Sequence, residues 1–503
     1  MPNTATSVAR FLLRGYGLTA CLMLFALFAP PTAHASEPEL PVGAPWFNVE
    51  RPLTAANLRG HVVLLDFFTP GCINCIHVLP DMAKLESEFG DRLLVLGVNS
   101  PKFTASERSA NIDGFIARYG IRHPVLTDRG MTLWKAYHVF AWPTQILLGP
   151  EGKVAGRFVG EGQYAQIREA VIRTLAEARR NGTLKQTPLP LKPPGVDAKG
   201  LLQPGKIAVS PRYVAVSDSG HNRVIVLNHQ GKVLRIIGSG NAGAQDGSAA
   251  TASFSGPQGL AFHRGMLYVA DTGNQLIRRI ALPSGNVGTV AGDGNRAYGV
   301  HGTHAALETA LNSPWGLEAV GNDLFIAMAG DHQVWKLDLQ HGRIGPFAGS
   351  GAEGIADGPA SRASFAQSSG LAHHAGTLYV ADPESSAVRA VALENGQVRT
   401  LVGRGLFTFG LRDGAAAQAL LQHDQGLAWL DGKLYIADTF NNAVRVLDPS
   451  AARVATLATG LAQPGGLAVL DAHTLLVADT NANRIVAVDT RSGVLRDWPL
   501  SGL

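Results

Sequence analysis

The sequence contains little cysteine: three residues among 503, namely Cys21, Cys72 and Cys75. A structural zinc site needs about four ligands. No second Cys-x-x-Cys pair exists, and His77 alone does not complete a set, so we expect no metal site at this pair. If Cys21 is removed with a leader, no third thiol remains to scramble a bond between Cys72 and Cys75.

Long apolar runs and an excess of charge are also missing. The apolar run at residues 18–29 has 12 residues, whereas a membrane-spanning helix needs about 20. Lysine and arginine number 43 against 39 acidic residues, and no basic patch stands out. We therefore expect no nucleic-acid partner and no stable membrane span once a leader is removed.

Residues 1–35 have the features of a secretory signal peptide. Arg10 and Arg14 precede the apolar run, and Ala-His-Ala at 33–35 fits the small-x-small cleavage pattern. We expect export into an oxidising space, most simply the bacterial periplasm. Two alternatives stay open: an uncleaved anchor, and lipid attachment at Cys21.

The rest of the chain divides at a proline-rich segment. Residues 36–182 mix helix-like and strand-like patterns, as an α/β domain does. Residues 183–199 include Thr-Pro-Leu-Pro-Leu-Lys-Pro-Pro-Gly and predict a semi-rigid extended linker. From 200 to 503 short β patterns separated by glycine repeat, which predicts an all-β domain.

A strand of the type Leu-Tyr-Val-Ala-Asp recurs six times in this second half. Gly-Leu-Ala-like strands precede five of the copies, and the period is 40 to 57 residues with four strands per unit. Such a period predicts a six-bladed β-propeller. The pattern resembles the NHL-repeat family, although the third copy has Met328 and Ala329 where the family has Asp-Thr.

The Cys-Ile-Asn-Cys motif follows an apolar strand at 62–68 and precedes a helical apolar spacing. A sulfur at a helix N-terminus meets unpaired N–H groups and the positive end of the dipole, which favour the reactive thiolate. Cys72 is therefore the expected nucleophile and Cys75 the resolving thiol. Their spacing suits a Cys72–Cys75 disulfide, which would be redox-active and would need no other cofactor. A static disulfide is the alternative.

The first half resembles the secreted, TlpA-related thioredoxin-like family through this motif, its strand and Trp142-Pro143-Thr144. The resemblance implies that Asp66 is a buried proton acceptor and that Pro143 belongs to a cis-proline loop that binds substrate beside Trp142 and Thr144. The alternatives are that Asp66 faces water at the strand end and that Pro143 is an ordinary turn proline. For Trp142, packing is expected more than contact with substrate.

Two positions depart from thioredoxin. Gly71 replaces the bulky tryptophan expected before the first cysteine, and Ile73-Asn74 replaces Gly-Pro inside the motif. The inner residues influence the reduction potential, which spans roughly −270 to −120 mV in this class. The direction of electron flow therefore stays open.

Polar glycine-rich loops of the propeller are expected on one face, where a protein partner would bind. The candidates are Asp271, Asn274, Asp438 and Asn441. The alternative is that each aspartate bonds the backbone of its own turn.

Together these patterns predict an exported thiol-disulfide oxidoreductase that acts on protein dithiols and disulfides, with the propeller as a protein-binding module. The order of the two parts resembles a family that joins a thioredoxin-like domain to NHL repeats. A redox-inactive scaffold is the alternative. A thiol peroxidase is a further alternative. Leu65 argues against it, because the peroxiredoxin pattern needs proline at that position.

Overall fold

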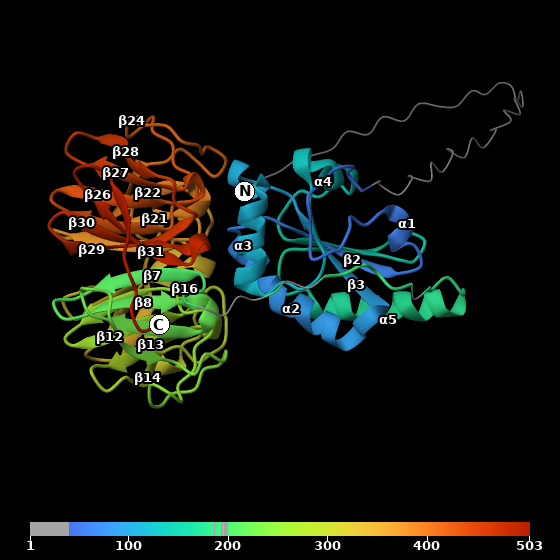
Figure 1. The fold of residues 1–503 in the computed structure, drawn as a ribbon, viewed down its shortest axis with the longest axis horizontal. Coiled ribbons are helices and arrows are strands. Elements are labelled where there is room, and N and C mark those ends of the chain that lie inside the picture. The colour runs from blue at the N-terminus through green and yellow to red at the C-terminus, as the bar shows by residue number, and fades with distance from the viewer. Residues whose placement is uncertain (1–39, 186, 193–194, 196–199) are drawn as a thin grey trace, which may run out of the picture. The chain divides into compact units, whose positions relative to one another are not determined.

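The computed structural model describes residues 40–185, 187–192, 195 and 200–503. The expected signal peptide, residues 1–35 with Cys21, lies outside the described residues. In the described part of the chain, no helix is long and apolar enough to cross a membrane. A thioredoxin-like α/β domain is followed by a six-bladed propeller (Figure 1), so the predicted fold class is confirmed.

A mixed sheet of six strands forms the centre of the α/β domain, in the order β1-β4-β3-β2-β5-β6. Strands β2, β3 and β4 are parallel. Every residue of β2 is buried, which explains its nearly continuous apolar sequence, because a central strand is covered on both faces. The strands are β1 (Trp46–Phe47), β2 (Val62–Phe68), β3 (Leu93–Asn99), β4 (Val125–Thr127), β5 (Thr144–Leu148) and β6 (Val154–Val159).

Helices cover both faces of this sheet. Alternate residues of β2 point to opposite faces: Leu64 packs in a cluster with Met82 of α2, and Phe67 packs in another with Leu133 of α4. The helices are α1 (Ala55–Leu58), α2 (Ile73–Phe89), α3 (Ser109–Tyr119), α4 (Thr132–Ala136) and α5 (Tyr164–Arg180), with 3₁₀ turns η1 (Gly90–Arg92), η2 (Thr104–Glu107) and η3 (Arg129–Met131). The cysteine-bearing helix α2 is thus fixed on the sheet by its apolar side.

The described part of the proline-rich segment lies along the α/β domain. Glu50 N donates to Pro190 O at 2.9 Å, and Lys192 N donates to Asn48 O at 3.0 Å. Proline has no N–H but keeps its carbonyl acceptor, so an extended proline-rich strand can still pair on one side. The described residues 190–192 are thus attached to the domain that precedes them.

Six antiparallel sheets form the propeller. Each blade has four long strands, and two blades gain a short fifth one, β15 (His304–Ala305) and β24 (Gly414–Ala415). The strands of blades one to three are β7 (Pro204–Val209), β8 (Val214–Asp218), β9 (Arg223–Leu227), β10 (Val233–Ile237), β11 (Leu260–His263), β12 (Met266–Asp271), β13 (Leu276–Ala281), β14 (Asn286–Ala291), β16 (Pro314–Val320), β17 (Asp323–Met328), β18 (Gln333–Asp338) and β19 (Arg343–Ala348).

The strands of blades four to six continue this pattern, and the C-terminal residues then meet the outer strand of blade one. Ser501 N donates to Gly231 O at 3.0 Å, and Val233 N donates to Ser501 O at 2.9 Å, which closes the ring. The strands are β20 (Gly370–His374), β21 (Thr377–Asp382), β22 (Ala387–Ala392), β23 (Val398–Val402), β25 (Gly426–Leu430), β26 (Lys433–Asp438), β27 (Ala443–Asp448), β28 (Arg453–Thr459), β29 (Pro464–Asp471), β30 (Thr474–Asp479), β31 (Arg484–Asp489) and β32 (Leu495–Asp497).

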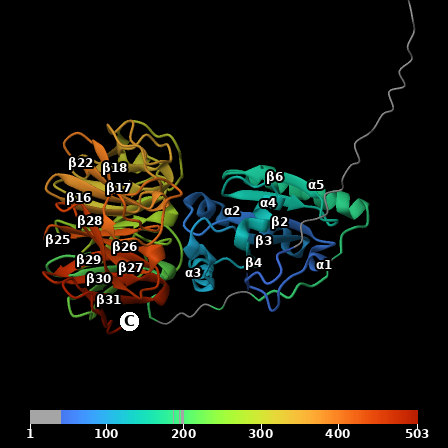
Figure 2. The ribbon, with the colours of Figure 1, turned by 90° about the horizontal axis from the view of Figure 1, so that it is seen from above.

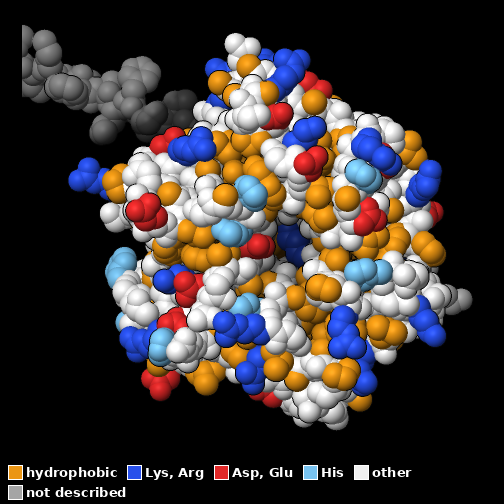
Figure 3. Space-filling model, turned by 90° about the vertical axis from the view of Figure 1, so that its left-hand side faces the viewer, with side chains coloured by type: hydrophobic (Ala, Val, Ile, Leu, Met, Phe, Trp, Pro, Cys, Tyr) orange, Lys and Arg blue, Asp and Glu red, His pale blue; other side chains and the backbone are white. Residues whose placement is uncertain are grey.

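The repeated Gly-Leu-Ala strands lie around the propeller axis. A Cβ atom on Gly370 would come within 2.6 Å of Gln425 O in the next blade, and one on Gly466 within 2.8 Å of Gly205 O. Such distances are too short for a side chain, so the glycine of this motif permits the inner strands to approach one another. In blade one, Lys206 stands at the position of this glycine. Figure 3 shows a cationic side chain at the bottom of the hollow on the propeller axis.

One loop face of the propeller carries a ring of hydrogen bonds that links neighbouring blades. In each blade the residue after the 3₁₀ turn between the second and third strands accepts a bond from the backbone N–H of a residue just before the next inner strand. The acceptor and donor residues are Asn222 and Gly256, Gln275 and Ser313, His332 and Gln367, Ser386 and His423, Asn442 and Gln463, and Asn483 and Gln203.

Candidate functional site

Cys72 is the N-cap of α2, one residue before the helix begins. The backbone N–H of Cys75 donates to the Cys72 sulfur over 3.3 Å. Cys72 is 6% exposed and Cys75 1% exposed, and both are free thiols. The outer sulfur of the predicted pair therefore lies at the positive end of the helix.

Asp66 lies in β2 behind the cysteine helix and is buried. Gln145 Nε2 donates to Asp66 Oδ1 at 2.8 Å, whereas Asp66 Oδ2 has no hydrogen-bond partner among the described atoms. Burial raises the pKa of Asp66. Burial also raises the pKa of Cys75 well above its usual value, with smaller contributions from Cys72 and from the charge of Asp66. The water-facing alternative for Asp66 is thus ruled out by its burial.

The peptide between Trp142 and Pro143 is cis, as the resemblance implies. Pro143 and Thr144 are both buried, and the Thr144 hydroxyl donates to Ala141 O at 2.7 Å. Contact of Thr144 with substrate stays a prediction. The Trp142 ring packs against the Trp134 ring with centroids 4.5 Å apart, and Trp142 is partly buried beside the cysteines. Packing is therefore its main role, and Pro143 remains the substrate-loop candidate.

The propeller covers one side of the cysteine motif. Ile73 N, at the first position of α2, donates to Gln367 Oε1 of blade four at 2.8 Å. The Ile73 side chain packs with Trp315 and Ala329 of blade three. This contact accounts for one departure from thioredoxin, because an isoleucine inside the motif supplies an apolar surface for the propeller.

The other departure has a steric cause. A Cβ atom on Gly71 would lie 2.6 Å from His423 Cε1 of blade five, and the φ of Gly71 is +95°. Both the close approach and the left-handed backbone favour glycine. The His423 ring occupies the space next to the motif where a tryptophan would otherwise extend.

Further contacts fix the two domains to each other, with α2 and α3 facing the propeller (Figure 2). Lys102 pairs with Glu384, and their side chains are 5% and 4% exposed. Arg118 of α3 donates to Gln203 Oε1 at 2.8 Å. The aromatic ring of Phe103 packs against the rings of Phe409, His423 and Phe440.

A histidine of the cysteine helix adds a polar contact with blade three. His77 Nε2 lies 2.7 Å from Ser313 Oγ, and His77 Nδ1 lies 2.8 Å from Glu161 Oε2. Burial lowers the pKa of His77, against the opposing effect of Glu161. This imidazole links the two domains and is buried among their side chains.

The loop face predicted to receive a protein partner thus carries the thioredoxin-like domain of the same chain. The four candidate residues there form hydrogen bonds within the propeller, and their role in binding a partner stays a prediction. Asn274 Nδ2 donates to Asp271 Oδ2 and to Gly243 O, and Asn441 Nδ2 donates in the same way to Asp438 Oδ2 and Gly410 O.

Each of these aspartates also pairs with an arginine of the next strand. Arg278 Nη1 lies 2.8 Å from Asp271 Oδ2, and Arg445 Nη1 lies 2.7 Å from Asp438 Oδ2. All four side chains are fully buried, and a buried charge requires such a partner. The turn alternative therefore describes these residues better than a binding role does.

Blade three replaces both members of the ion pair. Met328 stands at the aspartate position, and Trp335 stands at the arginine position, opposite Ile326 in the ladder. Both are fully buried. The two substitutions compensate, because an apolar pair avoids leaving a buried charge without a partner.

Comparisons with known proteins agree with this architecture. A model of the AhpC/TSA family matches residues 37–157. NHL repeat-containing protein 2 of Gallus gallus is 38% identical over 519 residues, which cover 92% of this chain and 71% of the relative. The chain belongs to the NHL repeat-containing protein 2 family.

Two other relatives of this NHL repeat-containing protein 2 family member differ in how much of the chain they match. Protein SUPPRESSOR OF QUENCHING 1, chloroplastic, of Arabidopsis thaliana is 38% identical over 493 residues, 91% of this chain and 47% of the relative. Thiol-disulfide oxidoreductase ResA of Bacillus thuringiensis is 29% identical over 111 residues, 22% of this chain and 62% of the relative.

Sequence reasoning did not find the propeller residues at the cysteine motif of this family member. Gln367, His423 and Glu384 lie roughly 280 to 350 residues from their contacts in the thioredoxin-like domain. The one available signal was Gly71, whose missing side chain indicates that another part of the molecule comes close.

Proposed function

We propose that this chain is an exported thiol-disulfide oxidoreductase whose reacting groups are Cys72 and Cys75. The observation that carries the proposal is the placement of Cys72 at the start of α2, with the Cys75 N–H directed at its sulfur. Donors at a helix N-terminus stabilise a thiolate, and the thiolate is the nucleophile in disulfide exchange. The similarity to ResA, named a thiol-disulfide oxidoreductase, supports this reaction class.

The reaction proceeds in two exchanges. The Cys72 thiolate attacks one sulfur of a client disulfide, forms a mixed disulfide and releases the other client sulfur as a thiolate. Cys75 then attacks the Cys72 sulfur, which forms the Cys72–Cys75 disulfide and releases the second client thiol. The client is reduced by two electrons and the pair is oxidised by two; the reverse sequence oxidises a client.

Asp66 receives the Cys75 proton in this scheme. Its raised pKa and its unbonded oxygen Oδ2 suit a buried proton acceptor. Cys75 is itself buried with a raised pKa, so it needs a base before it can attack. A general base whose pKa approaches the working pH is the more effective one.

A client would approach from the cis-proline side, because the propeller covers the other side. Pro143 would bind an extended segment of a dithiol or disulfide protein, and Phe140 beside it is 74% exposed. We further propose that the leader directs the chain to the periplasm, and that the propeller serves as the protein-binding module that holds the cysteine domain.

A redox titration tests the proposal. The purified protein is equilibrated in buffers of reduced and oxidised dithiothreitol or glutathione, and the fraction of free thiols is counted by alkylation and mass spectrometry. We expect a reversible two-electron transition between roughly −270 and −120 mV. A pair that forms no disulfide under any buffer, or one that cannot be reduced again, would favour the scaffold function.

The match to the AhpC/TSA family favours testing a thiol peroxidase as the second candidate. Peroxide consumption by the reduced protein is followed over time, with Cys72→Ser as the control. We expect no consumption above that of the control. Rapid, stoichiometric oxidation of Cys72 by peroxide would instead assign a peroxidase.

A further inference from the structure

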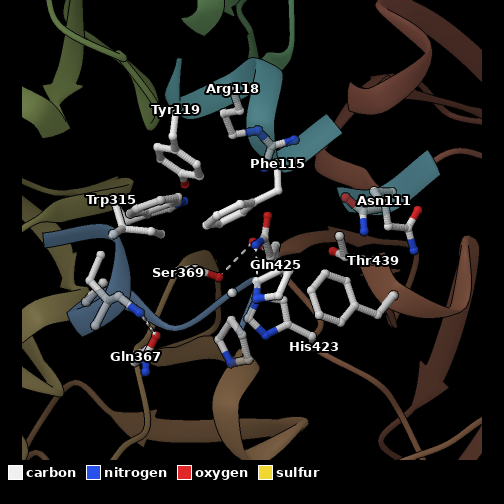
Figure 4. Close-up of a pocket in the computed structure, with 18 residues that line it drawn as sticks. Asn111, Phe115, Arg118, Tyr119, Trp315, Gln367, Ser369, His423, Gln425 and Thr439 are labelled. Atoms are coloured by element: carbon white, nitrogen blue, oxygen red, sulfur yellow. Dashed lines mark hydrogen bonds between the residues drawn. The ribbon is translucent and has the colours of Figure 1, made fainter. Parts of the chain in front are cut away.

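A cavity lies between the thioredoxin-like domain and the propeller, directly beside the cysteine motif. Its volume is about 40 Å³, and it is partly open to solvent. Gly71 and Ile73, the neighbours of Cys72 in the chain, line it together with Phe115 of α3 and Trp315 of blade three (Figure 4).

The lining of this cavity has a positive bias. It includes the Arg118 guanidinium and contains no aspartate or glutamate. Arg118 donates to the amide oxygens of Gln203 and Asn481, and no carboxylate among the described residues forms an ion pair with it. An arginine enclosed between two domains normally has an acidic partner.

A second cation lies nearby. Lys206 lines the axial channel, which shares Ser369 with the cavity. The pKa of Lys206 is lowered to about 7, mainly by burial and in smaller part by the positive charge of Arg118, against the opposing effect of the buried Asp424. Asp424 does not line the cavity, so the lining itself keeps its positive bias.

An unused donor faces the same space. Trp315 is 8% exposed, and its indole Nε1–H has no hydrogen-bond partner among the described residues. A buried donor without an acceptor is destabilising. A ligand that brings an oxygen acceptor would satisfy Trp315 and would supply the negative charge that Arg118 lacks.

We infer that this cavity binds a small organic carboxylate, with Arg118 and the Trp315 indole N–H as its donors. A single guanidinium suits a monoanion better than a dianion. The rings of Phe115, Tyr119 and Phe440 would contact the apolar part of the molecule. Because the donors belong to different domains, the ligand would bind only when the two domains are in contact.

Propionate and its neutral analogue propionamide form a matched pair of probes. In ¹⁵N-labelled protein, at constant ionic strength, the indole N–H signals of the seven tryptophans are followed during titration. We expect propionate to move one signal saturably, and the same signal to be missing in Trp315→Phe. Propionamide should leave it in place.

Thermal unfolding gives a second readout. Saturating propionate should raise the unfolding temperature by about 1–2 °C in the wild type, because it binds the folded state, and by less in Arg118→Gln and Trp315→Phe. Trp315→Phe keeps the aromatic ring, so it tests the site even if Arg118→Gln disturbs the contact with Gln203.

Three results would overturn the assignment: an equal response to propionamide, an undiminished response in Trp315→Phe, or a stronger response to inorganic phosphate than to propionate. The proposal does not depend on the redox function, since neither readout uses the cysteines.

Discussion

The two sides of the cysteine motif differ in what lies against them. On the propeller side, Gly71 and Ile73 contact His423, Gln367 and Trp315 of the same chain. On the cis-proline side, Phe140 is largely exposed, and no hydrogen bond joins the described residues 140–143 to the propeller. The motif is thus adapted to a permanent neighbour on one side and is left free for a client on the other.

The largest effect is expected from filling the propeller side. Gly71→Trp restores the bulky residue of thioredoxin but places it in the space of the His423 ring. Overpacking and the left-handed backbone together should destabilise the docked state by about 3 kcal/mol or more. Calorimetry should show the thioredoxin-like domain and the propeller unfolding separately.

Gly120→Trp is the matched control for this change. Gly120 also has a positive φ, and a Cβ atom added there would meet no other described atom within 4 Å. It should keep a single transition. If both variants unfold alike, the contact with His423 does not restrict position 71.

A charge deletion on the propeller side should have a comparable effect on stability. Lys102→Ala removes the cation from a buried pair and leaves the Glu384 carboxylate uncompensated, at a cost of about 3–5 kcal/mol. Denaturant titration measures it. The double variant Lys102→Met/Glu384→Gln should recover most of the loss, and Lys84→Ala, from an exposed pair, should change little. Equal losses in the single and double variants would contradict this account.

Asp66→Asn tests the buried carboxyl group behind the cysteine helix, which belongs to neither the propeller side nor the cis-proline side. A protein that contains a carboxyl group with a higher pKa in the folded than in the unfolded state becomes less stable as the pH rises above the unfolded-state pKa of about 3.9. The pKa of Asp66 is raised, so Asp66→Asn should be more stable than the wild type at neutral pH. The difference should vanish in acid.

The same variant should slow the second exchange, because the Cys75 proton loses its acceptor. We expect mixed disulfides on Cys72 to persist about tenfold longer or more, measured by quenched-flow alkylation. A gain in stability with no change in this lifetime would make Asp66 a structural residue only.

The smallest effect is expected at Gln367, which binds the first N–H of α2. Gln367→Glu places a carboxylate near the Cys72 sulfur and disfavours its thiolate. Iodoacetamide should then alkylate Cys72 about two- to fivefold more slowly at neutral pH. Gln340→Glu, on an exposed blade turn, is the control, and an equal rate in both variants would show that the propeller does not influence the sulfur.

How far the sequence alone predicts this molecule depends on the range of the contacts. The six blades and the helix beginning after Cys72 follow from local patterns, because each blade repeats after 40 to 57 residues and a helix start is recognised within a few residues. The interface does not, because Lys102 and Glu384 are 282 positions apart. Sequence also did not distinguish a binding aspartate at 271 from a structural one, since that depends on its contact with Arg278.

Trapping of mixed disulfides tests the central claim most directly. Cys75→Ser and Cys72→Ser are expressed in the native compartment, and disulfide-linked clients are separated on non-reducing gels and identified by mass spectrometry. Cys72 is predicted to hold many clients in Cys75→Ser, whereas Cys72→Ser should hold far fewer. Equal trapping by the two variants, or none by either, would contradict the assignment of Cys72 as the attacking sulfur.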